Sequence, residues 1–111
     1  MPIVYLQKAS DLADYISNNP TTLIIVDFYA DWCGPCKVIG GVFDNELVPQ
    51  YKEKLLVIKV DSDNDDLNSL ADQFKVRGIP RLIVYYNKKI IDDITGANVE
   101  AVRGHCRTYC K

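Results

Sequence analysis

The sequence predicts an α/β fold in which four helices flank a central mixed β-sheet, with elements in the order βαβαβαββα. Two observations lead to this prediction: hydrophobic spacing switches repeatedly between the strand and helix periods, and two strand segments are apolar on both alternating faces. Strands buried on both sides require helices above and below the sheet, joined by right-handed crossovers. Even composition, without linkers or repeats, predicts one domain over residues 1–111.

A short apolar segment, residues 3–6, predicts the first strand, and a helix follows it. Ser10 precedes this helix as a candidate N-cap. Asn18, Asn19 and Pro20 end it, because Asn and Pro favour turns. The apolar positions that we expect on its inner face are Leu12, Ala13 and Ile16.

Residues 22–30 are β-branched and apolar on both faces, which is typical of a central strand. A second helix begins near Pro35, whose fixed φ suits the first helical turn. We expect Pro49 to kink or end this helix, because proline disturbs the preceding turn. The apolar residues at helical spacing along it are Val38, Ile39, Val42, Phe43 and Leu47.

Residues 55–60 predict another buried strand, and Asn64 or Asp65 can cap the helix that follows. The inner stripe of that helix comprises Leu67, Leu70, Ala71 and Phe74.

Residues 81–86 and 89–95 predict two antiparallel strands, because Asn87 and Lys88 between them have the spacing of a hairpin, although the turn lacks glycine. Asn98 then caps the last helix. The stripe of that helix comprises Val99, Val102, Cys106 and Tyr109.

Charge and hydropathy exclude several classes of partner. Thirteen Lys and Arg against fifteen Asp and Glu give a formal charge of -2, which leaves no basic stripe for nucleic acid or an anionic membrane surface. The longest apolar run, residues 23–26, is far below the ~20 residues that cross a bilayer. Lys8 and Asp11 stand where a signal peptide would be hydrophobic. We therefore expect a cytoplasmic protein.

The four cysteines raise the question of function. A reducing compartment disfavours a framework of structural disulfides. Cys33-Gly34-Pro35-Cys36 lies where a central strand meets a helix, and a helix N-terminus stabilises a thiolate, so this pair can alternate between a small-ring disulfide and two thiols. The alternatives are a plain structural disulfide and half of a zinc site completed by the other two cysteines, Cys106 and Cys110.

Asp27 interrupts an otherwise apolar strand, so its carboxylate should be buried, at a cost of several kcal/mol if it is charged. Lys59, on the neighbouring strand, is the candidate partner. Burial would raise the pKa of Asp27 and make it a proton donor or acceptor for a nearby thiol. The alternative is a polar strand end that the backbone satisfies.

Three further features have simple interpretations. Pro80 precedes a strand, so it stands at an edge, at a strand start or after a cis bond. His105 neighbours Cys106, but adjacent helical residues point in different directions, which predicts an ordinary surface histidine. The acidic loop from Asp61 to Asp72 lacks the glycine and glutamate that a calcium loop requires.

The segment VDFYADWCGPCK, residues 26–37, together with VRGIP at residues 76–80 and Gly96, resembles the thioredoxin family over essentially the whole chain. The resemblance implies the thioredoxin fold and a protein-disulfide reductase, a carrier of electrons by dithiol-disulfide exchange that holds no bound cofactor or metal. It implies two kinds of partner: a thioredoxin reductase that uses NADPH, and disulfide-containing clients such as peroxiredoxins.

By the same resemblance, Cys33 is the exposed nucleophile and Cys36 is the buried cysteine that resolves the mixed disulfide. Asp27, helped by Lys59, assists proton transfer at Cys36. Pro80 is cis and lies against the active-site disulfide. The resemblance also implies a docking surface for an extended client, to which Ile79 offers backbone hydrogen bonds. This surface comprises Trp32, Gly34, Pro35, Ile79, Pro80, Thr95 and Gly96.

The chain departs from the family pattern at four places. Gly40-Gly41 replaces a small residue and a proline, and each glycine weakens a helix by roughly 1 kcal/mol relative to Ala. Arg81 replaces a threonine, which places a cation close to the docking surface, and Ser62 replaces an apolar residue.

The fourth departure is the pair Cys106 and Cys110. Their Cβ atoms should lie about 5 to 6 Å apart in a helix, too far for a disulfide without distortion of the last turn. We expect Cys106 to be an inert core thiol and Cys110 to be exposed, so that the monomer can form a disulfide-linked dimer through Cys110.

Two other functions fit the same sequence. One is a binding or scaffold module of the thioredoxin fold in which the cysteines are incidental. The other is a zinc-binding structural protein that uses all four cysteines. Intact Cys33, Cys36 and Asp27 favour the redox function.

Overall fold

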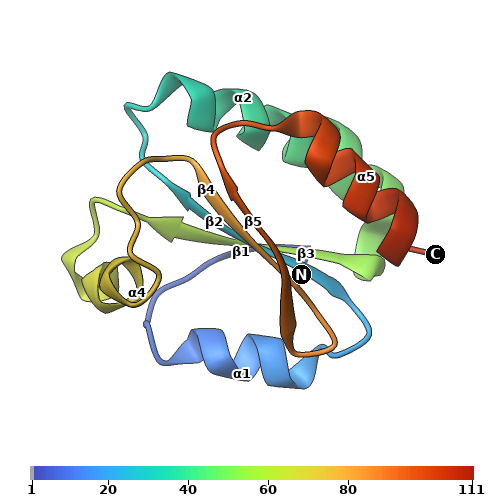
Figure 1. The fold of residues 1–111 in the computed structure, drawn as a ribbon, viewed down its shortest axis with the longest axis horizontal. Helices are drawn as coiled ribbons and strands as arrows, with labels where there is room; N and C mark the ends of the chain where they lie inside the picture. Colours follow the sequence, from blue (N-terminus) through green and yellow to red (C-terminus); the bar gives the residue numbers. More distant parts are fainter. Residues whose placement is uncertain (1) are drawn as a thin grey trace.

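A five-stranded mixed sheet forms the centre of the computed structural model, which describes residues 2–111 (Figure 1). The strand order is β1-β3-β2-β4-β5, in which β3 is parallel to β1 and β2, whereas β4 is antiparallel to β2 and β5. The predicted mixed sheet and element order are confirmed. The strands are β1 (Ile3–Tyr5), β2 (Leu23–Tyr29), β3 (Leu55–Asp61), β4 (Arg81–Tyr86) and β5 (Lys89–Thr95).

Helices cover both faces of the sheet, and each face has its own apolar core. Alternate residues of β2 point to opposite faces, so Leu23 and Ile25 pack in one core while Ile24 and Val26 pack in the other. Figure 1 shows α2 and α5 on one face and α1 and α4 on the other. These helices are α1 (Asp11–Asn18), α2 (Gly34–Val42), α4 (Asn68–Gln73) and α5 (Val99–Tyr109).

The helical segment that starts with α2 does not end at Pro49. A π-helical turn, η1 (Phe43–Leu47), follows α2 and leads into α3 (Val48–Tyr51), with Pro49 in the first turn of α3. A π turn shifts the hydrogen-bond register ahead of the proline, which has no N–H to donate. The stripe is also narrower than predicted, because Val38 is 61% exposed whereas Ile39, Phe43 and Leu47 are buried.

Helix α1 begins without the expected cap. Ser10 has helical backbone angles, φ −64° and ψ −21°, and its side chain makes no capping hydrogen bond, because capping requires an extended residue at this position. Asp11 and Asp14 in the first turn complement the helix dipole instead. Ala13 is exposed, so the predicted inner face was wrong at that position, and Leu12 is the buried residue of this helix.

The other turn and cap predictions are confirmed. The Asn64 side chain accepts a hydrogen bond from the backbone N–H of Asp66 at the start of the short 3₁₀ helix η3 (Asp65–Leu67), and Asn98 accepts one from Ala101. Asn87 and Lys88 have φ of 53° and 67°, the paired positive angles of a two-residue hairpin turn. None of the helices within residues 2–111 combines the length and apolar character needed to cross a membrane.

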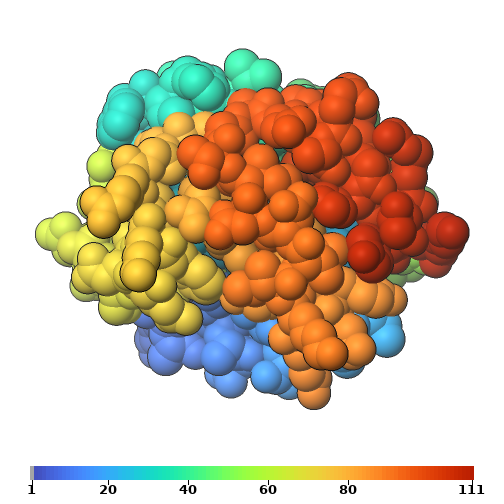
Figure 2. Space-filling view, in the orientation of Figure 1, coloured from blue at the N-terminus to red at the C-terminus, as the bar shows by residue number. Residues whose placement is uncertain are grey.

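Polar and charged side chains hold α5 against its neighbours, and Figure 2 shows α5 (red) packed directly beside β5 (orange). Arg103 makes a two-pronged contact with Glu46 of η1, at 2.6 and 2.7 Å. His105 Nε2 lies 2.7 Å from Asp92 Oδ2 of β5 and lowers the pKa of that carboxyl by hydrogen bonding. His105 is therefore half-buried in an inter-element contact and not an ordinary surface histidine.

We expect the substitution Gly41→Ala to raise the free energy of unfolding by about 0.5–1 kcal/mol, because alanine restricts the unfolded chain and favours the helix. A Cβ at this position would meet its nearest neighbour, Asn45 Nδ2, at 3.9 Å, an ordinary contact. Urea denaturation measures the change.

Gly96→Ala is the matched control, since Gly96 has φ +98°, where a side chain is strained, and this variant should lose stability. A loss of stability in Gly41→Ala as well would mean that the glycine is required where α2 approaches the π turn.

Candidate functional site

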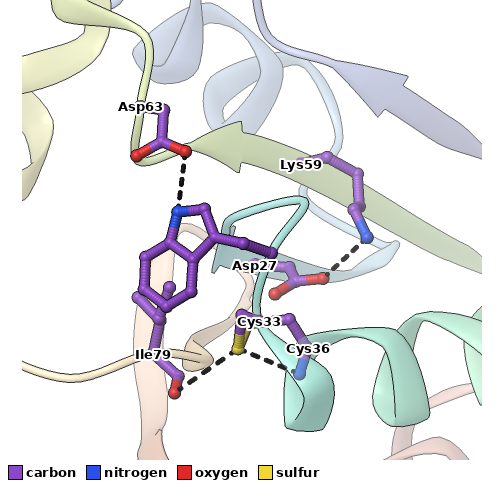
Figure 3. Close-up of a disulfide and its surroundings, with 7 residues drawn as sticks. Asp27, Cys33, Cys36, Lys59, Asp63 and Ile79 are labelled. Carbon is purple, nitrogen blue, oxygen red and sulfur yellow. Dashed lines mark hydrogen bonds and ion pairs between the residues drawn. A yellow bond between two sulfur atoms is a disulfide. The ribbon is translucent and has the colours of Figure 1, made fainter.

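Cys33 and Cys36 form a disulfide at the point where the chain leaves β2 and enters α2 (Figure 3). Cys33 is the N-cap residue of α2, with extended backbone angles, and its Sγ accepts a hydrogen bond from the backbone N–H of Cys36 at 3.2 Å. Pro35 occupies the first helical turn, where its missing N–H costs nothing. The CxxC sequence thus places one sulfur in the position that an N-cap oxygen normally takes.

This position favours negative charge on Cys33. The first N–H groups of a helix have no partner within the helix, and the helix dipole adds positive potential there. A sulfur that already accepts one of these N–H groups is better stabilised as a thiolate than a free cysteine. The arrangement can therefore support thiol-disulfide exchange in which Cys33 carries the charge.

The expected exposure of Cys33 was wrong. Cys33 is 5% exposed and Cys36 is 3% exposed, because Ala30 and Ile79 pack against the disulfide. The neighbouring residue Trp32, in contrast, is 71% exposed. The Trp32 indole Nε1 donates a hydrogen bond to Asp63 Oδ2 at 2.9 Å, which fixes the ring beside the disulfide.

Asp27 is fully buried on β2, and Lys59 is its neighbour on β3 in the strand register. Asp27 Oδ2 forms an ion pair with Lys59 Nζ at 3.1 Å, but neither carboxylate oxygen has a partner in hydrogen-bond geometry within residues 2–111. Burial raises the pKa of the Asp27 carboxyl, and the Lys59 ammonium only partly opposes this. The predicted buried ion pair is confirmed, and the alternative of a strand end satisfied by the backbone was wrong.

A cavity of about 320 Å³ opens beside Lys59, the cationic partner of Asp27. Its lining includes Cys36, Gly40, Gly41, Lys59 and Tyr29. Lys59 Nζ also lies 4.4 Å from the centre of the Tyr29 ring, a cation–π contact. Burial, with nearby carboxylates, raises the pKa of Tyr29 to about 12, so its hydroxyl remains protonated at neutral pH. In Figure 3 the carboxylate of Asp27 is drawn between Lys59 and the cysteine pair.

Sequence reasoning missed Tyr29, although its place two residues after Asp27 on the same strand put it on the same face. Gly40 was interpreted only as a weakness of the helix. A Cβ at Gly40 would lie 3.5 Å from Lys59 Nζ, so the missing side chain leaves room around the ammonium.

The predicted docking residues gather around the disulfide. The Ile79–Pro80 peptide bond is cis, as the family resemblance implied, and the Ile79 carbonyl oxygen lies 3.9 Å from Cys33 Sγ. The Gly96 N–H donates to the Pro80 carbonyl at 2.8 Å, which joins the end of β5 to this loop. The exposed members of the set are Trp32, Gly34, Pro35 and Thr95.

Arg81 does not present a free cation to this surface. Its guanidinium pairs with the Asp93 carboxylate at 2.5 and 2.7 Å and holds the pKa of that carboxyl below its usual range. Ser62 donates its backbone N–H to the Tyr29 carbonyl at 2.8 Å, and its buried hydroxyl oxygen has no partner in residues 2–111. Arg81 and Ser62 therefore contact residues of neighbouring strands, and neither adds a free charge to the exposed surface around the disulfide.

Cys106 and Cys110 lie at the end of α5, and Figure 1 places this end far from the start of α2. A zinc site made of all four cysteines is therefore not formed, and no cluster of three or more metal-ligating side chains occurs within residues 2–111. Both thiols are free and buried. The expected exposure of Cys110 was wrong, since it packs in the core below α5 and is only 7% exposed.

Comparison with known proteins gives a consistent result. A family model described as Thioredoxin matches residues 3–107. A thioredoxin of Griffithsia pacifica is 39% identical over 74 residues, which are 67% of this chain and 65% of that protein. A thioredoxin of Mycoplasmoides gallisepticum is 34% identical over 92 residues, 83% of this chain and 86% of that protein. The match thus spans slightly less than two thirds of the Griffithsia relative.

Solved structures share the fold. The structure of Fasciola hepatica thioredoxin has a TM-score of 0.82 and 31% identity, and covers 96% of this chain and 98% of its own. The reduced Schistosoma mansoni thioredoxin pre-protein has a TM-score of 0.83 and 29% identity, with 98% and 99% covered.

The pH dependence of stability tests the environment of Asp27. Because its pKa is raised in the folded protein, the folded state binds the proton more tightly than the unfolded chain. Its contribution to stability is complete below the ordinary aspartate pKa, ~3.9, and is lost as the pH rises through the folded value. Asp27→Asn removes this loss, so the variant should exceed the parent by about 1–2 kcal/mol at neutral pH and by little near pH ~3.5.

Urea denaturation across this pH range measures the difference. Asp72→Asn is the control, because Asp72 is exposed and should show no such trend. An advantage of Asp27→Asn that is independent of pH would contradict the assigned cause.

Proposed function

The chain belongs to the thioredoxin family, and we propose that it reduces protein disulfides by dithiol-disulfide exchange through Cys33 and Cys36. The observation that carries this proposal is the disulfide at the N-terminus of α2, where Cys33 Sγ accepts the Cys36 N–H and lies opposite the Ile79 carbonyl. A structural disulfide needs neither the helix N-terminus nor an adjacent surface formed by a second loop.

The reaction begins with both cysteines reduced. The Cys33 thiolate attacks one sulfur of a client disulfide, which forms a bond between Cys33 and the client and releases the other client sulfur as a thiolate. Cys36, once deprotonated, attacks Cys33 Sγ and releases the second client sulfur. The client disulfide gains two electrons and two protons, and the Cys33–Cys36 disulfide is restored.

Asp27 acts on the proton of Cys36. A carboxyl group whose pKa is raised by burial can accept a proton from a thiol more readily than an ordinary aspartate can. The Lys59 ammonium offsets part of the free-energy cost of burying the Asp27 carboxylate. The cavity beside Lys59 lets the proton reach water. In this proposal Asp27 and Lys59 serve the resolving step.

The client lies over the loop that contains the cis bond. An extended segment can pair with the backbone of Ile79, as in recognition by strand addition. The exposed Trp32 ring on one side and Thr95 with Gly96 on the other bound this segment. Arg81 is neutralised by Asp93, so we do not expect it to select acidic clients.

We further propose that a thioredoxin reductase using NADPH restores the dithiol and that the protein acts in the cytoplasm as a carrier of electrons. Free Cys106 and Cys110 fit a reducing compartment. The experiment is reduction of insulin disulfides, first with dithiothreitol and then with NADPH and a thioredoxin reductase. A protein that binds disulfide clients but does not reduce them would be a scaffold and would overturn the proposal.

The two cysteines should fail in different ways. Cys33→Ser removes the nucleophile and should abolish insulin reduction. Cys36→Ser retains the nucleophile but not the resolving thiol, so it should accumulate a mixed disulfide with a client peptide. Mass spectrometry without reducing agent detects the adduct. Equal adduct formation by both variants would contradict the assigned roles.

Asp27→Asn should slow disulfide reduction by about tenfold or more at a pH below the thiol pKa, and by less at higher pH, where Cys36 needs no base. Stopped-flow measurement between about pH 6 and 9 gives the profile. Asp72→Asn again serves as the exposed control. Identical profiles for Asp27→Asn and the parent protein would remove Asp27 from the mechanism.

A further inference from the structure

The last turn of α5 contains a second pair of thiols that the proposed function does not use. Cys106 is fully buried in the core between the sheet and α5, and Cys110 is the residue directly after the helix. Both are free. They lie in one continuous apolar cluster with Leu47 and Leu55, which leaves little space for a large partner.

The two thiols lie one helical turn apart in the same apolar core. The Cys110 thiol donates to the Lys54 carbonyl at 3.4 Å. The neighbouring Cys110 thiol and burial raise the pKa of Cys106, whereas the neighbouring Cys106 thiol and the Lys54 ammonium lower the pKa of Cys110. The thiol nearer the surface is therefore the more easily ionised one, and a buried thiol lies behind it.

The backbone at Cys110 also departs from the regular helix geometry on which the expectation against a Cys106–Cys110 disulfide was based. Cys110 has φ −98° and ψ 57°, outside the helical range, although its N–H still donates to the Cys106 carbonyl at 2.9 Å. The Cβ separation of an ideal helix therefore does not apply to Cys110. Helix ends open locally more easily than helix interiors, so only the last turn must rearrange to bring the sulfurs together.

We propose that Cys106 and Cys110 are a second thiol-disulfide site, in which Cys110 reacts with a small-molecule disulfide and Cys106 resolves the product into an intramolecular disulfide. This site is independent of Cys33 and Cys36 and does not rest on the proposed function. Its substrate class is a low-molecular-weight disulfide of a thiol such as glutathione, which is small enough to reach a residue that is 7% exposed.

The steps balance as follows. Cys110 loses its proton and attacks one sulfur of the small disulfide, which forms a mixed disulfide at Cys110 and releases one thiolate, which takes up that proton. Cys106 then loses its proton and attacks Cys110 Sγ, which releases the second small thiol. The protein loses two protons and two electrons, and the small disulfide takes them up to become two thiols.

The same geometry disfavours dimerisation through Cys110. A second protein chain cannot approach a sulfur buried at this depth as easily as a small disulfide can. Any mixed disulfide at Cys110 also lies one helical turn from Cys106, in the same apolar core. The intramolecular bond therefore forms before a covalent dimer can.

The test uses the full chain with Cys33→Ser and Cys36→Ser, which removes the other reactive pair. After incubation with oxidised glutathione, we expect a mass loss of two hydrogen atoms, the disappearance of both free thiols and no retained glutathione. Adding Cys106→Ala should trap one glutathione on Cys110. Adding Cys110→Ala should make the modification of Cys106 at least about tenfold slower than that of Cys110.

Circular dichroism of each variant checks that it is folded, and Cys106→Val replaces Cys106→Ala if the alanine variant is not. Dithiothreitol should reverse the bridge. A stable glutathione adduct in the parent that retains Cys106, a covalent dimer, or two thiols that react only in denaturant would each overturn the proposal.

Discussion

Burial of β2 on both faces is the constraint on which the site depends. Each residue of this strand must point into one of two apolar cores, and side chains alternate between them. Asp27 therefore belongs to the face that α2 covers, the same face as Leu23 and Ile25. The chain leaves the end of the same strand and reaches Cys33 at the start of α2. The buried carboxylate and the cysteine pair therefore lie on the same side of the sheet.

The buried ion pair shows how this constraint conflicts with stability. A carboxylate inside an apolar core is costly, and one ammonium group at 3.1 Å offsets the cost only in part, since Asp27 Oδ1 has no hydrogen-bond partner in residues 2–111. The Tyr29 ring and the open space at Gly40 keep Lys59 in place and close to water. A carboxyl group that is incompletely satisfied can change its protonation state at a pH where an ordinary aspartate cannot.

Much of this arrangement could be predicted from the sequence, because it follows from local periodicity and from single residues out of place. The buried strands, the hairpin at Asn87 and Lys88, and the pairing of Asp27 with Lys59 are all of this kind. Exposure could not be predicted in the same way. Cys33 and Cys110 are buried by residues distant in sequence, Ile79 for the first and the Lys54 region for the second. Neither contact leaves a periodic signal in the chain.

The two cysteine pairs differ chiefly in which end of a helix holds them. Cys33 caps the N-terminus of α2, where unpaired N–H groups and the dipole stabilise a thiolate, and this matches a pair that exchanges disulfides rapidly. Cys110 follows the C-terminus of α5, where the dipole opposes negative charge, so only the neighbouring Cys106 thiol and the Lys54 ammonium favour its ionisation. The same chemistry at the second pair should therefore be slower, and it requires the last helical turn to open before the sulfurs can meet.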